Sequence, residues 1–306
     1  MNSAAEPITQ PHGGGQAKPS RPVLSAVLIT MGTRPEELKR SINSILNQAE
    51  PPSEIILVGN GVEVPGLPSE VTQIPLAENI GIPAGRNRGS DAARGDVLVF
   101  VDDDGWLADD HVFSHLRDEF AAQPDLGIVS FQVADPDGGP GFRRHVPRLR
   151  AGDPQRSSDV TTFLGTAYAL RKEVLEQCGG LPDVFFYGHE ETDLAWRALD
   201  HGWRIRYDAQ AKIFHPAVLP TRHDLFYRMN ARNRVLIARR NLPWILVPFY
   251  LGSWTAITVV RVRKVQPLKV WFKGFAEGWR MDPGPRRPMK WKTVVRMTRL
   301  GRPPVI

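Results

Sequence analysis

The stretch that decides the fold is DVLVFVDDD, residues 96–104, in which a run of apolar residues ends in three aspartates. A short, continuous apolar run predicts a strand buried on both faces, as the strands of a parallel sheet are. Polar side chains that follow such a strand lie at its carboxyl end, where open α/β sheets bind their ligands. We therefore expect a strand over Asp96–Val101 and a functional site at Asp102–Asp104.

Upstream of this strand, apolar strand-like runs alternate with helical patterns. The predicted elements are a strand at Ser25–Thr30, an amphipathic helix with apolar positions Leu38, Ile42, Ile45 and Leu46, strands at Glu54–Gly59 and Val71–Leu76, and a helix at Pro83–Ala93. Strands that alternate with helices are typical of a parallel sheet. The sequence thus predicts an α/β fold with a Rossmann-like, mostly parallel sheet flanked by helices.

Downstream of the aspartates the alternation continues, with one interruption. Residues 135–159 form a long stretch rich in Gly, Pro and Arg, and a loop of this length is usually a lid, a binding loop or disorder. We expect the folded body to cover residues 23–220 and to end near Pro216–Pro220. Its further predicted elements are a helix near Asp109–Ala122, a strand at Gly127–Val133, an apolar stretch at Val160–Leu170, a helix near Lys172–Gln177, a strand-like piece at Val184–Tyr187 and a helix at Glu190–His201.

The three aspartates allow two interpretations. Alternate residues at a strand end point the same way, so Asp102 and Asp104 are able to approach one divalent cation while Asp103 faces elsewhere. Alternatively, the triplet is a solvated turn that opens the next helix, since Asp is a good N-cap residue. The position directly after the most apolar strand favours the metal site, because adjacent carboxylates repel one another unless a positive charge lies among them.

A second group of acids opens the predicted helix at Glu190–His201. A carboxylate in the first helical turn is stabilised by the helix dipole, so Asp193 has a credible structural role, paired with Arg197 four residues on. One carboxylate is enough to stabilise the start of this helix, so Glu190 and Glu191 are additional acids that need another explanation. Both are candidates for a general base, which must be a carboxylate or histidine able to reach a hydroxyl proton.

A series of motifs follows in order along the chain. They are TRPEEL at 33–38, ENIG at 78–81, GRNRG at 85–89, ARGD at 93–96, VLVFVDDD at 97–104 and the stretch from FLGT at 163–166 to GHEETDLAWR at 188–197. Together these motifs resemble the family 2 glycosyltransferases. The resemblance runs from about Ser25 to Pro216. It implies the GT-A fold and an inverting, metal-dependent hexosyl or deoxyhexosyl transfer from a nucleotide-diphosphate sugar to an acceptor hydroxyl.

The resemblance also implies a metal site and a base. Asp102 and Asp104 match the DXD-type acids that hold Mg²⁺ or Mn²⁺ against the diphosphate, and His215 matches a histidine that completes the metal shell in several relatives. A loop histidine hydrogen-bonded only for structure is the alternative for His215. Glu191 matches the second acid of the family's Glu-Asp pair, the usual catalytic base. Because this chain has Glu there in place of Asp, Glu190 is a rival for the role.

The remaining assignments concern the donor and the acceptor. Arg86 resembles a residue that lies near the nucleotide, where its planar guanidinium suits phosphate. Asn79 and Asn87 are alternatively supports of this loop, and for Asn87 a purely structural role is an equal alternative to a ligand role. Where the family commonly has an Asp after the second strand for base recognition, this chain has Asn60, so the base is left open. Trp106 is a candidate sugar contact, but an aromatic residue at this place is equally typical of the hydrophobic core. The predicted nucleotide-sugar ligands are Thr30, Arg34, Asn60, Asn79, Arg86 and Asp103, and the predicted acceptor or donor-sugar contacts are Trp106, Gly165 and Thr166.

Charge is unevenly distributed along the chain. Its 306 residues carry +6, but residues 221–306 hold 19 Lys/Arg and 3 Asp/Glu, so this segment carries +16 and the first 220 residues carry −10. The single cysteine, Cys178, excludes an intramolecular disulfide framework and a Cys-rich zinc site and favours a reducing compartment. Residues 1–22 lack the apolar region of a signal peptide and are expected to form a disordered tail.

The basic segment 221–306 needs its own explanation. Leu242–Val260 has 19 residues without a charge, and KVWFKGFAEGWR at 269–280 interleaves aromatic and basic residues. We predict a helical, in-plane anchor on anionic lipid at the cytoplasmic face of the cell membrane. The alternatives are a buried helical pair with a solvated basic face and a single membrane span. Together with the resemblance, attachment implies a glycan or polyprenyl-linked acceptor, as in cell-surface polysaccharide assembly.

Two other functions fit the sequence less well. A sugar-phosphate nucleotidyltransferase has a related fold, and Gly32-Thr33-Arg34 is similar to its signature, but that signature has more glycines before the triplet and a lysine soon after it, whereas the next lysine here is Lys39. A nucleic-acid-binding protein would leave the acidic triplet without a role, so we expect no nucleic-acid partner. The sequence does not define an oligomeric state.

Overall fold

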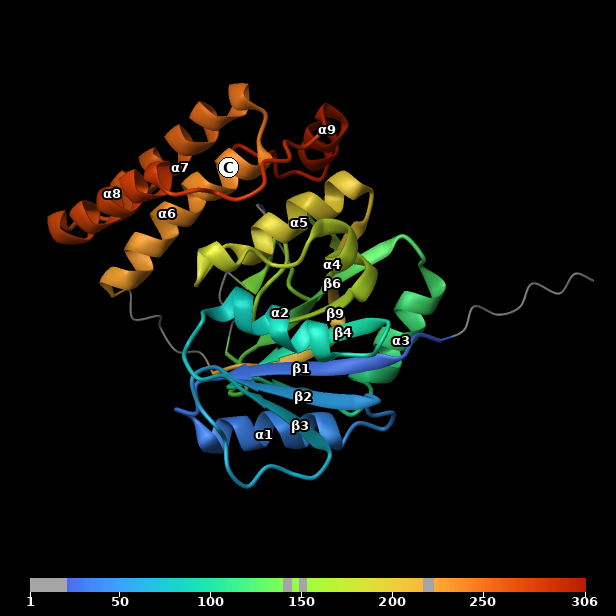
Figure 1. Ribbon diagram of the computed structural model, residues 1–306. Coiled ribbons are helices and arrows are strands. Elements are labelled where there is room, and N and C mark those ends of the chain that lie inside the picture. Colours follow the sequence, from blue (N-terminus) through green and yellow to red (C-terminus); the bar gives the residue numbers. More distant parts are fainter. Residues whose placement is uncertain (1–20, 140–144, 149–152, 217–222) are drawn as a thin grey trace, which may run out of the picture.

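The computed structural model describes residues 21–139, 145–148, 153–216 and 223–306. Nearly all of the predicted N-terminal tail, parts of the predicted loop at 135–159 and the expected end of the body at 217–220 lie outside these ranges. Figure 1 shows a central sheet with helices on both faces and, beyond α5, a group of C-terminal helices coloured orange to red.

The first half of the sheet is parallel, as the sequence predicts. Its strands lie in the order β3-β2-β1-β4. Alternate residues of β1 face opposite cores, with Ala26 and Leu28 on the side of α1 and Val27 on the side of α2. These elements are β1 (Leu24–Thr30), α1 (Pro35–Leu46), β2 (Glu54–Gly59), β3 (Val71–Pro75), α2 (Ile82–Ala92) and β4 (Val97–Asp102).

The second half of the sheet is mixed. β8 (Ala167–Arg171) runs antiparallel to β4 and to β6 (Leu126–Ala134), while β9 (Arg204–Phe214) runs parallel to β6. The predicted α/β fold is confirmed, and the reversal of β8 is the feature that apolar periodicity does not reveal. The remaining elements of this half are β5 (Trp106–Leu107), α3 (Val112–Ala122), β7 (Ser158–Asp159), α4 (Lys172–Cys178) and α5 (Glu190–His201).

The prediction of a strand-like piece at Val184–Tyr187 is wrong. The chain forms a short 3-10 helix, η2 (Asp183–Phe185), and Phe186 then adopts a positive φ of 58°. A positive φ is incompatible with a strand. The aromatic residues that suggested a strand instead form a tight turn that leads into α5.

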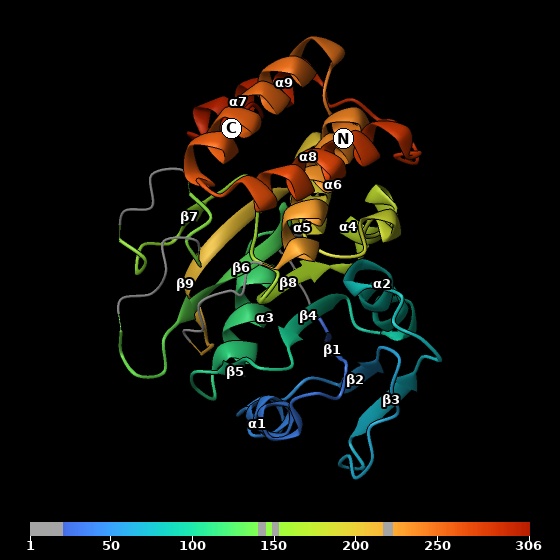
Figure 2. The same ribbon diagram turned by 90° about the vertical axis from the view of Figure 1, so that its left-hand side faces the viewer.

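The C-terminal segment is helical, as predicted, and its first helix belongs to the core. Val235, Leu236 and Ile237 of α6 are buried in the same apolar cluster as residues of β4 and α5. Figure 2 shows α6 above α5, with α8 beside it. The segment comprises α6 (Asp224–Asn241), η3 (Trp244–Leu246), α7 (Val247–Arg261), α8 (Val265–Arg280) and α9 (Trp291–Arg299). The predicted units 23–220 and 221–306 thus share one core, and their boundary stays a prediction.

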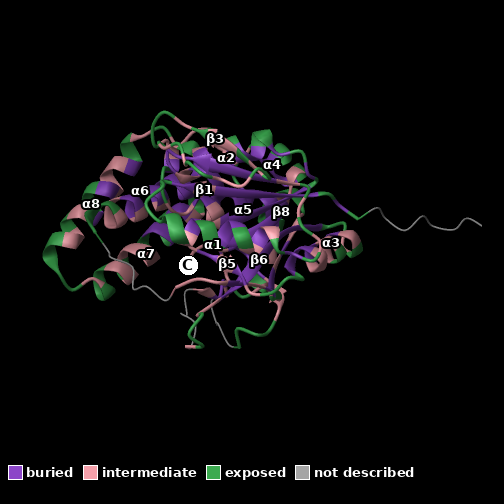
Figure 3. Cartoon of the chain, turned by 90° about the horizontal axis from the view of Figure 1, so that it is seen from below, coloured by how far each residue is buried: buried purple, intermediate pink, exposed green. Residues whose placement is uncertain are grey.

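The helices outside α6 expose apolar side chains. Trp244 is 58% exposed, Phe249 62% and Val260 75%. Figure 3 shows buried residues concentrated in the sheet, whereas α7 and α8 carry much exposed and intermediate surface. Within the described residues, the stretch Trp244–Arg261 is long and apolar enough to cross a membrane by length and composition, and 22% of it is buried.

Candidate active site

Two adjoining cavities lie at the carboxyl ends of β1 and β4. The first, which we call the β1 cavity, has a volume of about 460 Å³ and contains Asp103 and Asp104. The second, which we call the α5 cavity, has a volume of about 340 Å³ and contains Glu190 and Glu191. Asp102 lines both. Of the predicted site residues, all except Trp106 line one of these cavities.

The three aspartates have different partners. The Oγ1 of Thr30 donates to Oδ2 of Asp103 at 2.6 Å. Asp104 is paired with Arg34, and its Oδ1 lies 3.1 Å from Nε2 of His215. Asp103 therefore contacts the end of β1 and Asp104 faces His215, while Arg34 lies near both, with its Nη1 3.6 Å from Oδ1 of Asp103; the binding of one cation by Asp102 and Asp104 stays a prediction.

The donor set suits a hard divalent cation. Asp102 and Asp104 carry carboxylate oxygens and His215 an imidazole nitrogen, the ligand types that Mg²⁺ and Mn²⁺ accept, but among the described residues the group whose ligand atoms all lie within 4.8 Å of one another is His115, Glu119 and Asp208. Burial and the nearby charge of Asp104 raise the pKa of Asp102 to about 7, although Arg86 opposes the shift. Burial also raises the pKa of Asp104, but His215 and Arg34 together hold it below its ordinary value. An added cation would stabilise the ionised form of Asp102.

Arg86 connects the two acidic groups. Its side chain is 4% exposed, and Nη2 donates to Oδ1 of Asp102 at 2.9 Å and to the carbonyl of Gly165 at 2.7 Å. Its Nη1 lies 3.6 Å from a carboxylate oxygen of Glu190 and 3.6 Å from one of Glu191. The predicted contact of Arg86 with phosphate stays a prediction, because its guanidinium already faces protein oxygens.

The two glutamates at the start of α5 differ in burial. The side chain of Glu190 is 2% exposed and its Oε2 has no hydrogen-bond partner among the described residues. Burial and the charge of Glu191 raise the pKa of Glu190 to about 8, which favours its protonated form at neutral pH. Glu191 is 17% exposed and borders Gly165, where any Cβ would overlap its carboxylate. The geometry therefore favours Glu191 over Glu190 as a base.

Asp193 has the structural role that the sequence predicts. Its Oδ2 lies 2.6 Å from Nη2 of Arg197, and its Oδ1 accepts from Arg240 at 2.9 Å and from Asn241 at 2.6 Å. Burial raises the pKa of Asp193, but the two arginines outweigh it and keep the pKa below its ordinary value. The pairing with Arg197 is confirmed, and the partners from α6 are an addition that the sequence did not reveal.

Comparison with known proteins identifies the family. The family model described as "Glycosyl transferase family 2" matches residues 25–179, just over half of the 306 residues. The chain belongs to glycosyl transferase family 2. The matched range contains β1 to β4 and the aspartate triplet, but the β1 cavity is also lined by residues beyond it, namely Phe186, Tyr187, His215, His223 and Leu225.

Curated relatives of this family 2 chain are distant. The O-antigen biosynthesis protein RfbC of Myxococcus xanthus is 23% identical over 226 residues, 65% of this chain and 18% of its own length. The pre-mycofactocin glycosyltransferase of Mycobacterium tuberculosis is 24% identical over 262 residues, 80% of this chain and 49% of its own length. The chain thus spans half or less of the length of these relatives.

Solved structures confirm the GT-A fold. The mannosyltransferase PcManGT of Pyrobaculum calidifontis, in complex with GDP-Man and Mn²⁺, is 17% identical with a TM-score of 0.55, covering 93% of this chain and 86% of its own. TarS 1–349 of S. aureus is 14% identical with a TM-score of 0.60, covering 84% and 80%. At these identities the likeness shows the fold alone.

The predicted donor ligand Asn60 of this family 2 chain is engaged within the protein. Its Nδ2 donates to Oδ1 of Asn79 at 2.9 Å, and its Oδ1 accepts from the backbone amide of Ile80 at 2.9 Å. The Asn79 Oδ1 also accepts from the amide of Gly81 at 2.9 Å. Asn60 therefore holds the loop at 79–81 in place, and its role in base recognition stays a prediction.

Asn87 and Trp106 line neither the β1 cavity nor the α5 cavity. Asn87 donates from Nδ2 to the carbonyl of Leu181 at 2.9 Å and to Asp183 at 2.7 Å, which is the structural alternative. The ring of Trp106 lies 5.9 Å from that of Phe214 and beneath the guanidinium of Arg40. This packing gives no support to the predicted sugar contact of Trp106.

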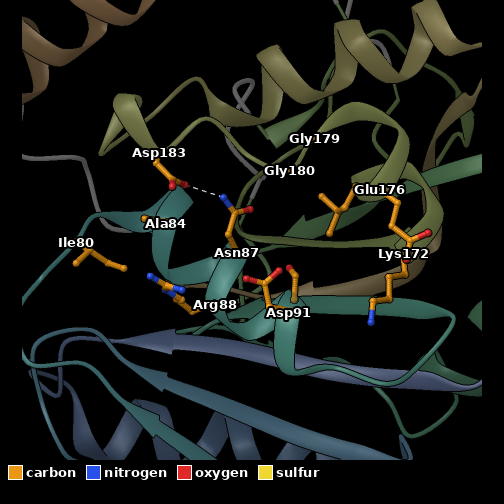
Figure 4. Close-up of a pocket in the computed structure, with 12 residues that line it drawn as sticks. Ile80, Ala84, Asn87, Arg88, Asp91, Lys172, Glu176, Gly179, Gly180 and Asp183 are labelled. Atoms are coloured by element: carbon orange, nitrogen blue, oxygen red, sulfur yellow. Dashed lines mark hydrogen bonds between the residues drawn. The ribbon is translucent and has the colours of Figure 1, made fainter. Parts of the chain in front are cut away.

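A third cavity, between α2 and α4, shares no lining residue with the other two. Its volume is about 470 Å³, and Figure 4 shows side chains of both charges around it, including Arg88, Asp91, Lys172 and Glu176. It contains none of the predicted site residues, so we assign the chemistry to the β1 and α5 cavities.

Sequence reasoning missed residues of the α5 cavity that come from the turn before α5 and from α6. They are Tyr187, His189, Phe226 and Asn230. For the residues of α6 the available signal was the cluster of Asn and Arg in YRMNARNR at 227–234, which the sequence placed in the basic segment, whereas His189 lies within the motif GHEETDLAWR at 188–197.

Proposed function

We propose that the protein is an inverting, metal-dependent glycosyltransferase that moves a sugar from a nucleotide-diphosphate sugar to a hydroxyl of a glycan or lipid-linked glycan. The observation that carries the proposal is the pair of adjoining cavities, one with the aspartate triplet and one with Glu191, joined by Asp102 and Arg86. Relatives named for O-antigen biosynthesis and pre-mycofactocin glycosylation, and neighbours solved with GDP-Man or UDP-GlcNAc, support the substrate classes.

The β1 cavity would hold the donor. Asp102, Asp104 and His215 are the residues that would hold Mg²⁺ or Mn²⁺, which neutralises the diphosphate as it leaves. Thr30, at the end of β1, and Asp103, directly after β4, lie beside this position, where the ribose would bind.

The α5 cavity would hold the acceptor hydroxyl. Glu191 accepts the hydroxyl proton as the oxygen attacks the anomeric carbon from the face opposite the diphosphate. The new carbon–oxygen bond forms as the bond to the diphosphate breaks, and the diphosphate leaves with the electron pair, so the configuration inverts. Arg86 and Gly165 hold the Glu191 carboxylate toward the cavity, the arginine by charge and the glycine by its lack of a Cβ.

The function is tested by incubating the full chain with UDP-, GDP- and dTDP-sugars and bacterial membrane lipid extract. Release of nucleoside diphosphate and labelling of the lipid fraction are measured with Mn²⁺ and with EDTA. We expect one donor class to be consumed in the presence of Mn²⁺ and chelation to stop its consumption. A folded protein that consumes none of them contradicts the proposal.

We also propose that the C-terminal helices attach the protein in the plane of the cytoplasmic face of a cell membrane. Val260, 75% exposed at the end of α7, and Val265, 67% exposed at the start of α8, flank the exposed basic residues Arg261, Arg263 and Lys264. Apolar residues beside cations match the interface of an anionic bilayer.

Attachment is tested by sedimentation with vesicles of phosphatidylglycerol and phosphatidylcholine. Phe249→Glu with Val260→Glu should release the protein into the supernatant, whereas Val23→Glu, at a residue 48% exposed before β1, should not. Equal sedimentation of both variants contradicts the anchor. Deleting residues 221–306 is a poorer test, because α6 is part of the core.

A further inference from the structure

The turn that leads into α5 is held by one amide of α6. Asn233 is fully buried, and its Nδ2 lies 3.0 Å from the carbonyl oxygen of Phe185, 3.0 Å from that of Tyr187 and 2.8 Å from that of Gly188. Three carbonyls of one turn therefore converge on a single side-chain donor. Buried carbonyls need such partners because no water replaces them.

Arg232 fixes the orientation of this amide. Its Nε donates to Oδ1 of Asn233 at 3.0 Å, which leaves Nδ2 directed at the carbonyls. Its Nη2 donates to the carbonyl of Phe185 at 2.6 Å and to that of Val184 at 3.1 Å. Arg232 is 6% exposed, so both residues act from within the core.

The turn needs external support because its backbone is strained. Phe186, with φ of 58°, and His189, with φ of 75°, are the two non-glycine residues with positive φ in the described part of the chain. Side chains with a Cβ rarely adopt this region unless their surroundings enforce it. On α6, Asn230 adds a further contact, with its Nδ2 3.0 Å from Nε2 of His189.

The position of this turn makes it important for the site. Tyr187 lines both cavities, Gly188 and His189 line the α5 cavity, and the next residues are Glu190 and Glu191. A shift of about 1 Å in a reacting group is enough to slow a reaction about 100-fold. The convergence of three carbonyls on Asn233 thus bears directly on where Glu191 lies.

We propose that Asn233 is a positioning residue for the transfer reaction, whose amide fixes the turn at 185–188 and thereby the place of the base Glu191. This inference rests on the proposed function. It also assigns to α6, a helix outside the matched family range, a direct part in the active site.

The test compares Asn233→Ala with Asn233→Asp. The aspartate keeps the volume of the side chain and an oxygen for Arg232 but replaces the donor NH₂ with an acceptor. We expect both variants to lower the kcat for donor turnover with Mn²⁺ about 100-fold, while the Kd for the matching nucleoside diphosphate changes less than about threefold. Near-normal turnover by Asn233→Asp means that only packing matters and overturns the proposal.

Hydrogen–deuterium exchange separates this proposal from the proposed function. Both variants should speed the exchange of peptides covering 184–192 and leave those of β1 and β4 unchanged. This readout needs no substrate, so it decides the positioning role even if no donor is turned over by the unaltered protein. Unchanged exchange at 184–192 contradicts the positioning role.

Two more variants complete the design. Arg228→Gln, which removes an ion pair between the partly exposed Arg228 of α6 and Glu277 of α8, should leave turnover within about twofold. If the Asn233 variants do not fold, Asn230→Ala replaces them, because Asn230 is only partly buried and contacts the same turn through His189. Because Asn230 also lines the α5 cavity, its readout is hydrogen–deuterium exchange: we expect faster exchange at 184–192, and exchange equal to that of Arg228→Gln overturns the proposal.

Discussion

The two acidic groups of the site have similar composition and different surroundings. In the triplet, Asp102, Asp103 and Asp104 are each paired with an arginine, a hydroxyl or a histidine. At the start of α5, Asp193 is completely enclosed by cationic and amide partners, whereas Glu190 keeps an unpaired oxygen. The comparison teaches that burial and partners, rather than the presence of a carboxylate, distinguish the proposed metal ligands and the proposed base from a structural anchor.

The sharpest way to break this comparison is to remove the proposed base, Glu191. Glu191→Gln should lower donor turnover about 1000-fold and leave the affinity for the nucleoside diphosphate within about threefold, because the amide cannot accept the acceptor proton. Steady-state kinetics and calorimetry check the two values. Glu190→Gln is the matched control with an expected loss below about tenfold, and a larger loss in the control reverses the assignment.

Replacing the structural acid Asp193 should lower the stability of the fold. Asp193→Ala leaves Arg197 and Arg240 beside an empty buried position, so we expect the free energy of unfolding to fall by about 3–5 kcal/mol. Urea unfolding measures it. Asp125→Ala, which removes a largely exposed pair with Arg204, should cost less than about 1 kcal/mol. Similar losses in the two variants are inconsistent with a buried anchor.

The triplet should respond through metal-dependent binding. Asp104→Ala is expected to weaken the Mn²⁺-dependent affinity for a nucleoside diphosphate about 100-fold and to leave the metal-free affinity unchanged. Asp103→Asn, which changes the acid bonded to Thr30, should have an effect below about tenfold. Calorimetric titration with and without Mn²⁺ compares them, and a larger effect from Asp103 contradicts the assigned ligands.

The smallest expected change concerns how the stability of the fold depends on pH when Glu190 is replaced. Glu190 has a pKa raised to about 8 by burial, so the folded chain binds this proton more tightly than the unfolded chain does. The stability from this group is fully present below the ordinary pKa of 4.5 and is lost as the pH rises through about 8. Glu190→Gln should therefore reduce the fall in urea midpoint between pH 5 and pH 8.5. An unchanged fall would show that Glu190 is not the group responsible.

The sequence predicts the half of the molecule in which local pattern determines structure. The apolar runs of β1, β2 and β4 and the polar residues after them were readable, because a buried strand needs a continuous apolar run and its end defines the site edge. The structural role of Asp193 was also readable, since Arg197 lies four residues on, whereas the partner of Asn87, Leu181, is 94 residues away and was not.

The other half depends on contacts between distant residues. The turn at 185–188 is held by Asn233, 48 residues from Phe185, so its aromatic pattern alone suggested a strand. The reversal of β8 depends on its neighbours β4 and β6 rather than on its composition. Asn60, a predicted nucleotide-sugar ligand, bonds Asn79 and Ile80 through its amide, which no linear motif encodes, and its role in base recognition stays a prediction.

The most direct test of the central claim, that the triplet and its cavity bind the diphosphate of a sugar nucleotide through a metal, is calorimetric titration of the full chain with UDP, GDP and dTDP, with and without Mn²⁺. We predict saturable binding of one base class with Mn²⁺ present and a loss of that binding when EDTA is added. Binding of equal strength with and without metal, or none to a folded protein, would contradict the claim.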